Sequence, residues 1–104
     1  MSFLQHDDEA VAVAPDLHKV VFEDGKLRVL EVTVPVGATA RMHWHPRNIN
    51  YIQSGGTLRF IRENGTTADL ELSVGQVTSS DAASHTVENI GDSEVRTVQI
   101  EFKD

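Results

Sequence analysis

The sequence predicts an all-β domain, either a sandwich or a barrel of short strands. Three observations carry this prediction. Turn-forming pairs that contain glycine recur at short intervals, the segments between them are rich in β-branched and aromatic residues, and no stretch keeps a helical period over three turns. Many segments alternate apolar with polar residues, which is typical of a strand with one buried face.

Eight segments are predicted as strands, in the order 18–22, 26–34, 38–45, 50–53, 57–61, 68–72, 84–90 and 94–102. The turns between them are marked by Asp24-Gly25, Val36-Gly37, Gly55-Gly56, Asn64-Gly65, Val74-Gly75 and Gly91-Asp92. Glycine adopts positive φ without steric cost, and asparagine or aspartate tolerates it. Residues 7–13 are expected to form one helical turn or an extra strand. No linker or internal repeat is visible, so residues 1–17 are interpreted as an N-terminal arm or extra strand and residues 18–104 as one barrel domain.

Composition excludes several classes of function. A chain of 104 residues suits a single core, and the absence of cysteine excludes disulfides, thiolate metal sites and cysteine nucleophiles. The net charge of -7, with no cluster of lysine or arginine, argues against nucleic acid and against anionic membrane surfaces as partners. The N-terminus lacks the pattern of a signal peptide, and no apolar run is long enough to span a bilayer. We therefore expect a cytoplasmic protein.

A pair of histidines in the segment MHWH, residues 42–45, is the strongest sign of chemistry. On a strand, side chains alternate between faces, so Arg41, His43 and His45 are expected on one side, with Met42 and Trp44 on the other. Both imidazoles then point into one space, where they could hold one divalent metal. Taken alone, such a pair is more often structural or a chance occurrence than a pair of ligands.

The surroundings of this pair add a longer pattern. The chain reads G-x5-H-x-H, then a glycine turn, then G followed by H-x3-N, formed by Gly37, His43, His45, Gly75, His85 and Asn89. This pattern resembles the two motifs of the cupin superfamily, G-x5-H-x-H-x(3,4)-E-x6-G and G-x5-P-x-G-x2-H-x3-N. The resemblance covers residues 18–102 and implies a small jelly-roll, or double-stranded β-helix, barrel. The stretch NYIQSGGTLRF also resembles the hairpin of short single-domain bacterial cupins.

The chain departs from the cupin motifs in two places. No aspartate or glutamate occurs between His45 and Glu63, so the glutamate of the first motif is missing. Its position falls on Asn48, or on Ile49 if the hairpin is shifted by one residue, and Asn50 also lies near enough to face the cavity. In the second motif, Ser80 and Ala82 replace the proline and the glycine, and the spacing from Gly75 is one residue short.

The resemblance implies a three-histidine metal site made of His43, His45 and His85, with Asn48 as a further candidate ligand. The cofactor would be one divalent transition metal, with Fe, Zn, Ni and Mn left open. Without a carboxylate ligand the ion keeps its full formal charge, which favours anionic or chelating substrates. Alternatively, the histidines hold no metal and line a site for an organic ligand, or are hydrogen-bonded residues of the interior. The resemblance also implies a homodimer.

Other polar residues are assigned by their position. Arg41, on the expected face of His43, and Asn50 are candidates for binding a substrate carboxylate, although Arg41 could equally be solvated at the barrel mouth. His6 and His18 lie outside the motifs and are expected at the surface or terminus. Asn89 is expected to cap backbone groups of a turn. No residue is assigned a catalytic role.

Two main functions follow as expectations. The first is a metal-dependent enzyme, with oxygenase chemistry as one candidate, acting on a small organic acid or an amino-acid-derived metabolite. The second is a non-catalytic module that binds or senses a small ligand, without metal if the histidines are not ligands. A structural role in a larger complex is a third possibility. The choice of reaction type rests on analogy of fold.

Overall fold

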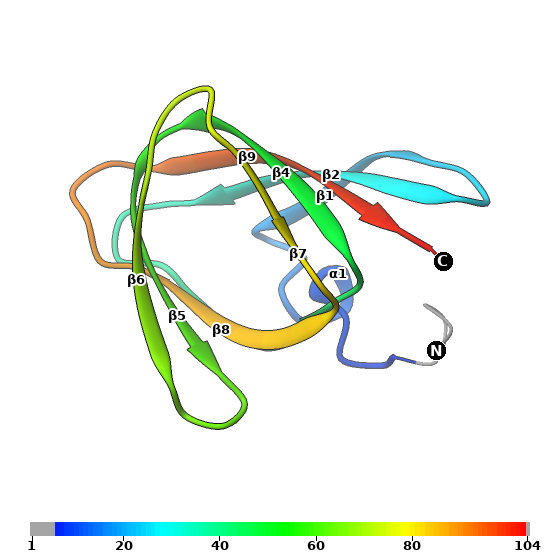
Figure 1. Cartoon of the computed structure of the whole chain (residues 1–104), viewed down its shortest axis with the longest axis horizontal. Helices are drawn as coiled ribbons and strands as arrows, with labels where there is room; N and C mark the ends of the chain where they lie inside the picture. Colours follow the sequence, from blue (N-terminus) through cyan, green and yellow to red (C-terminus); the bar gives the residue numbers. More distant parts are fainter. Residues whose placement is uncertain (1–5, 104) are drawn as a thin grey trace.

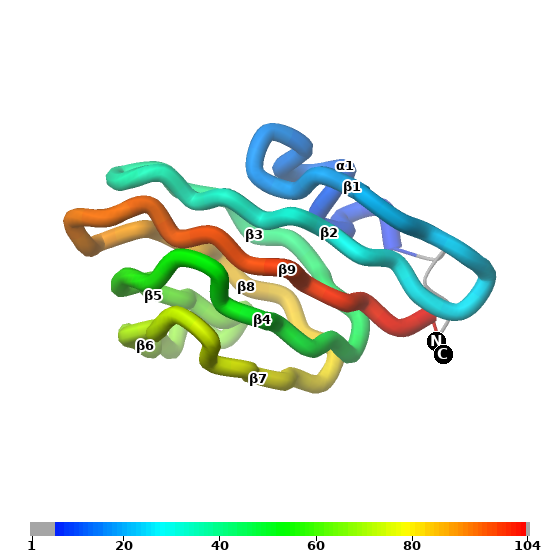
Figure 2. Tube along the Cα trace, turned by 90° about the horizontal axis from the view of Figure 1, so that it is seen from above, coloured from blue at the N-terminus to red at the C-terminus, as the bar shows by residue number. Residues whose placement is uncertain are grey.

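The structure, a computed structural model that describes residues 6–103, consists of two antiparallel β-sheets (Figure 1). The elements are α1 (Ala10–Val13), β1 (His18–Glu23), β2 (Leu27–Val34), β3 (Thr39–His45), β4 (Asn48–Ser54), β5 (Gly56–Arg62), β6 (Thr67–Leu72), β7 (Val77–Ser80), β8 (Ala83–Asn89) and β9 (Val95–Phe102). One sheet has the order β1-β2-β9-β4-β7 and the other the order β3-β8-β5-β6. Figure 2 shows the two sheets as layers, one behind the other. The prediction of an all-β fold is confirmed.

All eight expected strands are present, with bounds shifted by at most two residues. The structure adds a ninth, β7, which follows the turn at Gly75, a residue with φ of 84°. Of the two alternatives for residues 7–13, the helical turn is the observed one, and Glu9 caps it by accepting hydrogen bonds from the backbone N–H groups of Val11 and Ala12. None of the helices within residues 6–103 has the length and apolar character needed to cross a membrane.

The apolar core lies between the sheets and takes residues from both. It consists of Val34, Ala40, Leu58, Val87 and Val95, against which partly buried side chains such as Leu17 and Phe60 pack. These residues fill only part of the space between the sheets. The inward faces of β1, β3, β4 and β9 also bury histidine, asparagine, glutamine and glutamate side chains. Because polar side chains are seldom fully buried without a reason, this polar region marks the place to look for a site.

A β-bulge in β3 changes which residues share a face. Ala40 pairs with Val87 of β8, but His43 pairs with His85, so β3 has one residue more than its partner over this stretch. Ala40 and His43 therefore both face inward, while Arg41 and Met42 are exposed. The expectation that Arg41 shares the face of His43 is wrong, because strict alternation fails at the bulge.

The turn after β8 is held by Asn89, as expected from the sequence. This residue is 2% exposed, and its Nδ2 donates to the carbonyl oxygens of Val34 and Ser93 at 2.9 and 2.8 Å. Its Oδ1 accepts from the N–H of Gly91. Asn89 thus ties β2 to the β8–β9 connection, and its role is structural.

Candidate metal centre

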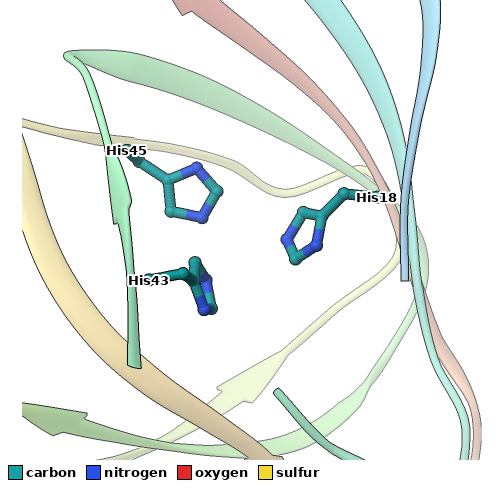
Figure 3. A group of neighbouring side chains, drawn as sticks. All are labelled: His18, His43 and His45. Carbon is teal, nitrogen blue, oxygen red and sulfur yellow. The ribbon is translucent and has the colours of Figure 1, made fainter. Parts of the chain in front are cut away.

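Three buried imidazoles converge between the sheets. His43 and His45 project from β3, and His18, the first residue of β1, projects from the opposite sheet. Figure 3 shows the three rings pointing toward one another. One ring nitrogen from each lies within 4.8 Å of those of the other two. The side chains are 5%, 0% and 4% exposed for His18, His43 and His45, so the group is shielded from solvent.

The burial of His18 corrects the expectation that it lies at the surface. Its backbone N–H and its ring Nδ1 both approach the carbonyl oxygen of Ala14, at 3.2 and 3.0 Å. It pairs with Val32 of β2, whose side chain packs against the core. This pairing depends on a β-bulge between Val20 and Phe22, since a regular hairpin continued from the Glu23–Arg28 pair would place position 18 opposite position 33. Neither motif spacing nor a regular hairpin could therefore have placed His18 in the site.

Each of the three rings is oriented by an oxygen on its Nδ1 side. The acceptors are the carbonyl oxygen of Ala14 for His18 at 3.0 Å, that of Arg41 for His43 at 2.7 Å, and Glu101 Oε2 for His45 at 2.7 Å. A carbonyl or carboxylate oxygen can only accept, which assigns the proton to Nδ1 and leaves the lone pair on Nε2. This is the arrangement in which histidines bind metals, with the second nitrogen held by an oxygen.

Among the ring nitrogens of this group, His43 Nε2 most clearly lacks a hydrogen-bond partner. It is buried, and no residue within the described range 6–103 makes a hydrogen bond to it. Buried polar atoms without a partner are rare, because leaving one unsatisfied costs about 1–3 kcal/mol. A lone pair that faces two other imidazoles instead of a donor is accounted for if it binds a cation.

Burial keeps these imidazoles neutral. Desolvation lowers the pKa of His18 to about 4 and that of His45 to about 3, and it also lowers the pKa of His43. The neighbouring histidines add to the decrease for His18 and His45, since each ring disfavours a positive charge on the next. At neutral pH all three rings therefore carry the lone pairs that metal binding requires.

A buried carboxylate lies behind His45, at a place that the sequence analysis missed. Glu101 on β9 is fully buried, and its Oε1 accepts from Arg28 Nε and Nη2 at 3.1 and 2.8 Å. Arg28 also pairs with Glu9, the capping residue of α1. Desolvation raises the pKa of Glu101, and the hydrogen bonds from Arg28 oppose that rise. The first motif thus has no carboxylate at its own glutamate position. Glu101, far away in the sequence, instead accepts a hydrogen bond from His45, a histidine of this motif.

His85 lies beside the three converging rings. It faces His43 across the β3–β8 pair, and its ring centroid is 4.9 Å from that of His43 and 5.3 Å from that of His45. Phe60 covers another side at 5.1 Å, and burial lowers the pKa of His85 to about 3. The group whose nitrogens lie within 4.8 Å contains His18 and not His85. A ligand role for His85 stays a prediction.

A cavity of about 360 Å³ adjoins the histidines. This volume is in the range of small-molecule sites. All four histidines line it, together with apolar side chains such as Leu58 and Phe60. Its polar lining includes Asn48, Asn50, Gln99, Arg62, Thr78, Ser79, Ser80, Ser84 and Thr97. The cavity can therefore hold a small ligand with both an apolar and a polar part next to a metal.

The two asparagines proposed from the sequence both line the cavity. Asn48 is buried, its Nδ2 donates to the carbonyl oxygen of Pro46 at 2.8 Å, and its Oδ1 accepts from Asn50 and Gln99. Because these hydrogen bonds use the oxygen that would bind an ion, we leave Asn48 out of the proposed metal site. Its ligation stays a prediction.

The arginine that lines the cavity is Arg62 and not Arg41. Arg41 is exposed and is absent from the lining, while its carbonyl oxygen orients His43. Arg62 at the end of β5 pairs in register with His85 and contributes to the lining. Arg62 is also exposed, and its Nη1 donates to Thr66 Oγ1 at 3.4 Å, but as part of the lining its guanidinium suits a ligand carboxylate. Substrate binding by the Arg41 side chain stays a prediction that no contact supports.

The donor set fits a divalent transition metal. Neutral imidazoles suit Zn, Fe and Ni, and the three rings offer lone pairs from two sheets. In a tetrahedral site with bonds of 2.0–2.1 Å, two nitrogens lie about 3.3 Å apart, so a pair at 4.8 Å would have to close by about 1.5 Å on binding.

Comparison with known proteins identifies the fold. No protein-family model matches the chain, and no curated protein is significantly similar to it in sequence. Among solved structures, a cupin domain from Bordetella pertussis Tohama I is similar with a TM-score of 0.76 and 24% identity over 84% of this chain and 92% of that one. A protein with a double-stranded β-helix domain from Klebsiella pneumoniae is similar with a TM-score of 0.67 and 20% identity over 83% of this chain and 75% of that one. An RmlC-like cupin family protein from Methanocaldococcus jannaschii has a TM-score of 0.67 and 10% identity over 83% of this chain and 78% of that one. The chain thus has the double-stranded β-helix fold of the cupins, as the sequence motifs predict.

Proposed function

We propose that the protein binds one divalent transition metal, from among Fe, Zn, Ni and Mn, through His18, His43 and His45. The observation that carries the proposal is the common orientation of the three rings, each with Nδ1 held by an oxygen and Nε2 left for an ion. His85 supports the same centre as a candidate fourth imidazole. Three-histidine sites without a carboxylate leave positions for water or substrate.

We further propose that the metal serves an enzyme that acts on a small organic acid or an amino-acid-derived metabolite. A bound ion would act as a Lewis acid, and no carboxylate ligand would reduce its positive charge. The chain's own residues would bind and orient the ligand, with Arg62 attracting the carboxylate and Leu58 and Phe60 packing against the apolar part. Oxygenase chemistry is the first reaction type to test. The cysteine-free composition suits a reducing compartment and supports the cytoplasmic location that completes the proposal.

The metal content of the untagged protein is the decisive measurement. We expect close to one metal per chain by elemental analysis and loss of the metal in His43→Ala. The matched control is His6→Ala, which also removes one imidazole but leaves the cavity lining intact. Circular dichroism must show that each variant is folded. Absence of metal in the wild-type protein, even after reconstitution with each of the four ions, would overturn the proposal.

Metal titration of the two alanine variants decides between His18 and His85. Only His18 belongs to the group with nitrogens within 4.8 Å, so His18→Ala is expected to lower metal affinity by at least about 100-fold, in line with loss of a ligand. His85→Ala is expected to lower it less. The reverse order would restore the ligand set that the sequence motifs predict, with His85 in place of His18.

A non-catalytic module that binds a small ligand is the second candidate function. The observation that favours it is the lining of the cavity, which contains no aspartate or glutamate among the described residues and hence no carboxylate to act as a general base. A panel of small acids separates the two functions when it is applied to the metal-loaded protein. Product formation or oxygen consumption supports the enzyme, while a thermal shift without turnover supports the binding module.

We also propose a homodimer. The outer face of the five-stranded sheet carries a row of apolar residues at one register level, Phe22 of β1, Val29 of β2, Ile100 of β9 and Ile49 of β4. Tyr51 and Val77 form a neighbouring pair and are 49% and 62% exposed. A second copy of the same face would cover these side chains, as contiguous exposed apolar patches commonly mark an interface.

A further inference from the structure

Three carboxamides form a connected group in the cavity wall. Asn48 and Asn50 lie on β4 and Gln99 on the adjacent strand β9, where Asn50 and Gln99 are register partners. Asn48 is 4% exposed and Gln99 is 6% exposed, and all three side chains line the cavity. Asn48 accepts from Asn50 Nδ2 at 2.8 Å and from Gln99 Nε2 at 3.2 Å.

The orientation of each amide follows from a single backbone carbonyl. The carbonyl oxygen of Pro46 can only accept, so the group of Asn48 that lies 2.8 Å from it is the Nδ2 donor. The Oδ1 of Asn48 therefore points the other way, toward Asn50 and Gln99. Both neighbours must present nitrogen to it, since two carbonyl oxygens in contact would repel each other. A rotation of the Gln99 amide by 180° is thereby excluded.

This orientation leaves one acceptor without a donor. Gln99 Oε1 is buried, and none of the residues in the described range 6–103 donates a hydrogen bond to it. An unsatisfied buried acceptor lowers stability, and such atoms are found where a ligand completes the hydrogen bonding. The other buried atom without a partner, His43 Nε2, would bind the proposed metal. Gln99 Oε1 belongs to a neutral amide of the cavity wall, so the metal does not account for its missing donor.

The charges around Gln99 select among possible donors. The nearest carboxylate on the same strand face, Glu101, is already engaged by Arg28 and His45. Arg62 adds positive charge to the lining. Among residues 6–103, no carboxylate lines the cavity to balance an ammonium ion, and a bound metal would repel one. A neutral O–H or amide N–H is the donor that the site accepts.

We propose that Gln99 Oε1 accepts a hydrogen bond from a neutral hydroxyl or amide N–H of the ligand, so that the cavity selects hydroxy acids over the corresponding acids without the hydroxyl. The inference rests on the proposed function in one respect, because it places the acid group of the ligand at the metal and Arg62. The missing donor to Gln99 Oε1 does not depend on whether a metal binds. Gln99 is thus assigned as a specificity-determining residue.

Matched acids provide the test. The probes are lactate against propionate and 3-hydroxybutyrate against butyrate, and their affinities for the zinc-loaded protein are measured by calorimetry. We expect the wild-type protein to prefer the hydroxy acid of at least one pair by about tenfold, the effect of one well-formed hydrogen bond in a buried site. In Gln99→Met, which keeps the volume but removes the acceptor, we expect that preference to fall to about that of free zinc in solution.

Controls separate recognition from folding and from metal loading. Gln53→Met makes the same chemical change at an exposed glutamine of β4 that does not line the cavity, and it is expected to leave the preference unchanged. Gln99→Leu replaces Gln99→Met if the latter does not fold. Elemental analysis of each variant shows whether metal is still bound, so a failure of the metal centre is distinguished from a failure of this inference.

Two outcomes would overturn the inference. One is a wild-type protein that shows no preference beyond that of free zinc in either pair, which the wild-type measurement alone decides. The other is an equal preference in the wild-type and in Gln99→Met or Gln99→Leu. If the wild-type protein binds no metal, the same four acids are tested on the metal-free protein. A tenfold preference there still supports Gln99, and its absence counts against it.

Discussion

The oxygen atoms that orient the three histidine rings of the site come from residues at very different sequence separations. The acceptor for His43 is two residues away, that for His18 four residues away, and that for His45 lies at Glu101, 56 residues away. The first two rings are therefore oriented by local backbone geometry. The third depends on the packing of β3 of one sheet against β9 of the other and on the buried pair of Glu101 with Arg28.

Residue-scale electrostatics leads to a prediction for pH. His18 and His45 have folded-state pKa values of about 4 and about 3, below the ordinary value near 6.5. Between these values the unfolded chain binds more protons, so the stabilisation is complete above about pH 6.5 and is lost as the pH falls toward 3. The full shifts correspond to at most about 3 kcal/mol for His18 and about 5 kcal/mol for His45. Glu101, whose pKa is raised, opposes it in part below neutral pH.

The measurement is urea unfolding of the metal-free protein between pH 7 and pH 4. We expect the free energy of unfolding to fall steeply below pH 6.5 in the wild-type protein. His45→Gln, which cannot take up a proton, should show a shallower slope. A flat profile in the wild-type protein would show that the rings are not buried in the neutral form.

At the scale of elements, residues 6–17 contact the residues that hold the site. Asp8 accepts from the N–H of Trp44 at 2.7 Å through its carbonyl oxygen, and the ring of His6 stacks on Trp44 at a centroid distance of 3.5 Å. Glu9 caps α1 and also pairs with Arg28, which in turn binds Glu101. The segment thus supports His45 through Glu101, in addition to holding His18 through Ala14.

Two substitutions of Glu9 separate its capping role from its charge. Glu9→Gln keeps an oxygen for the cap but removes the ion pair, and Glu9→Ala removes both. We expect Glu9→Ala to lower the free energy of unfolding by about 1–3 kcal/mol, since it loses a cap and a partner of a largely buried guanidinium, and Glu9→Gln to lower it less. Chemical denaturation measures both, and Asp7→Ala serves as an exposed control. Equal losses in the two Glu9 variants would show that the charge alone matters.

Much of this arrangement follows from the sequence, and the failures have physical causes. Glycine turns and alternation predict the strands, and the H-x-H spacing places His43 and His45 together because a strand repeats every two residues. The misplacement of Arg41 arises from a bulge that no turn residue announces. Glu101 and Gln99 were not predicted because their partners are distant in the chain. The contact of Glu101 with His45 crosses between the sheets and that of Gln99 with Asn48 joins two neighbouring strands, and neither leaves a spacing pattern in the sequence.

On the scale of the whole molecule, one sheet has an apolar outer face that a second copy would cover. We expect light scattering coupled to gel filtration to give twice the 11.5 kDa mass of the chain. Ile100→Lys, at the centre of the row formed with Val29 and Ile49, is expected to shift the protein to the monomer. Thr33→Lys, on the outer face of β2 but away from this row, is the control. A monomeric wild-type protein at tens of micromolar would contradict the proposal.

The place of β9 in the chain order has a consequence for how metal could be acquired during synthesis. β9 lies between β2 and β4, and it is made after every histidine of the site. Until it is inserted, no strand joins β2 to β4, and His45 has no Glu101 to hold its Nδ1. A nascent chain that has emerged only through β8 thus carries all four imidazoles without their enclosing wall. We therefore expect selective metal loading to begin only when the last strand has docked, so that the order of translation itself delays the capture of ions by an incomplete site.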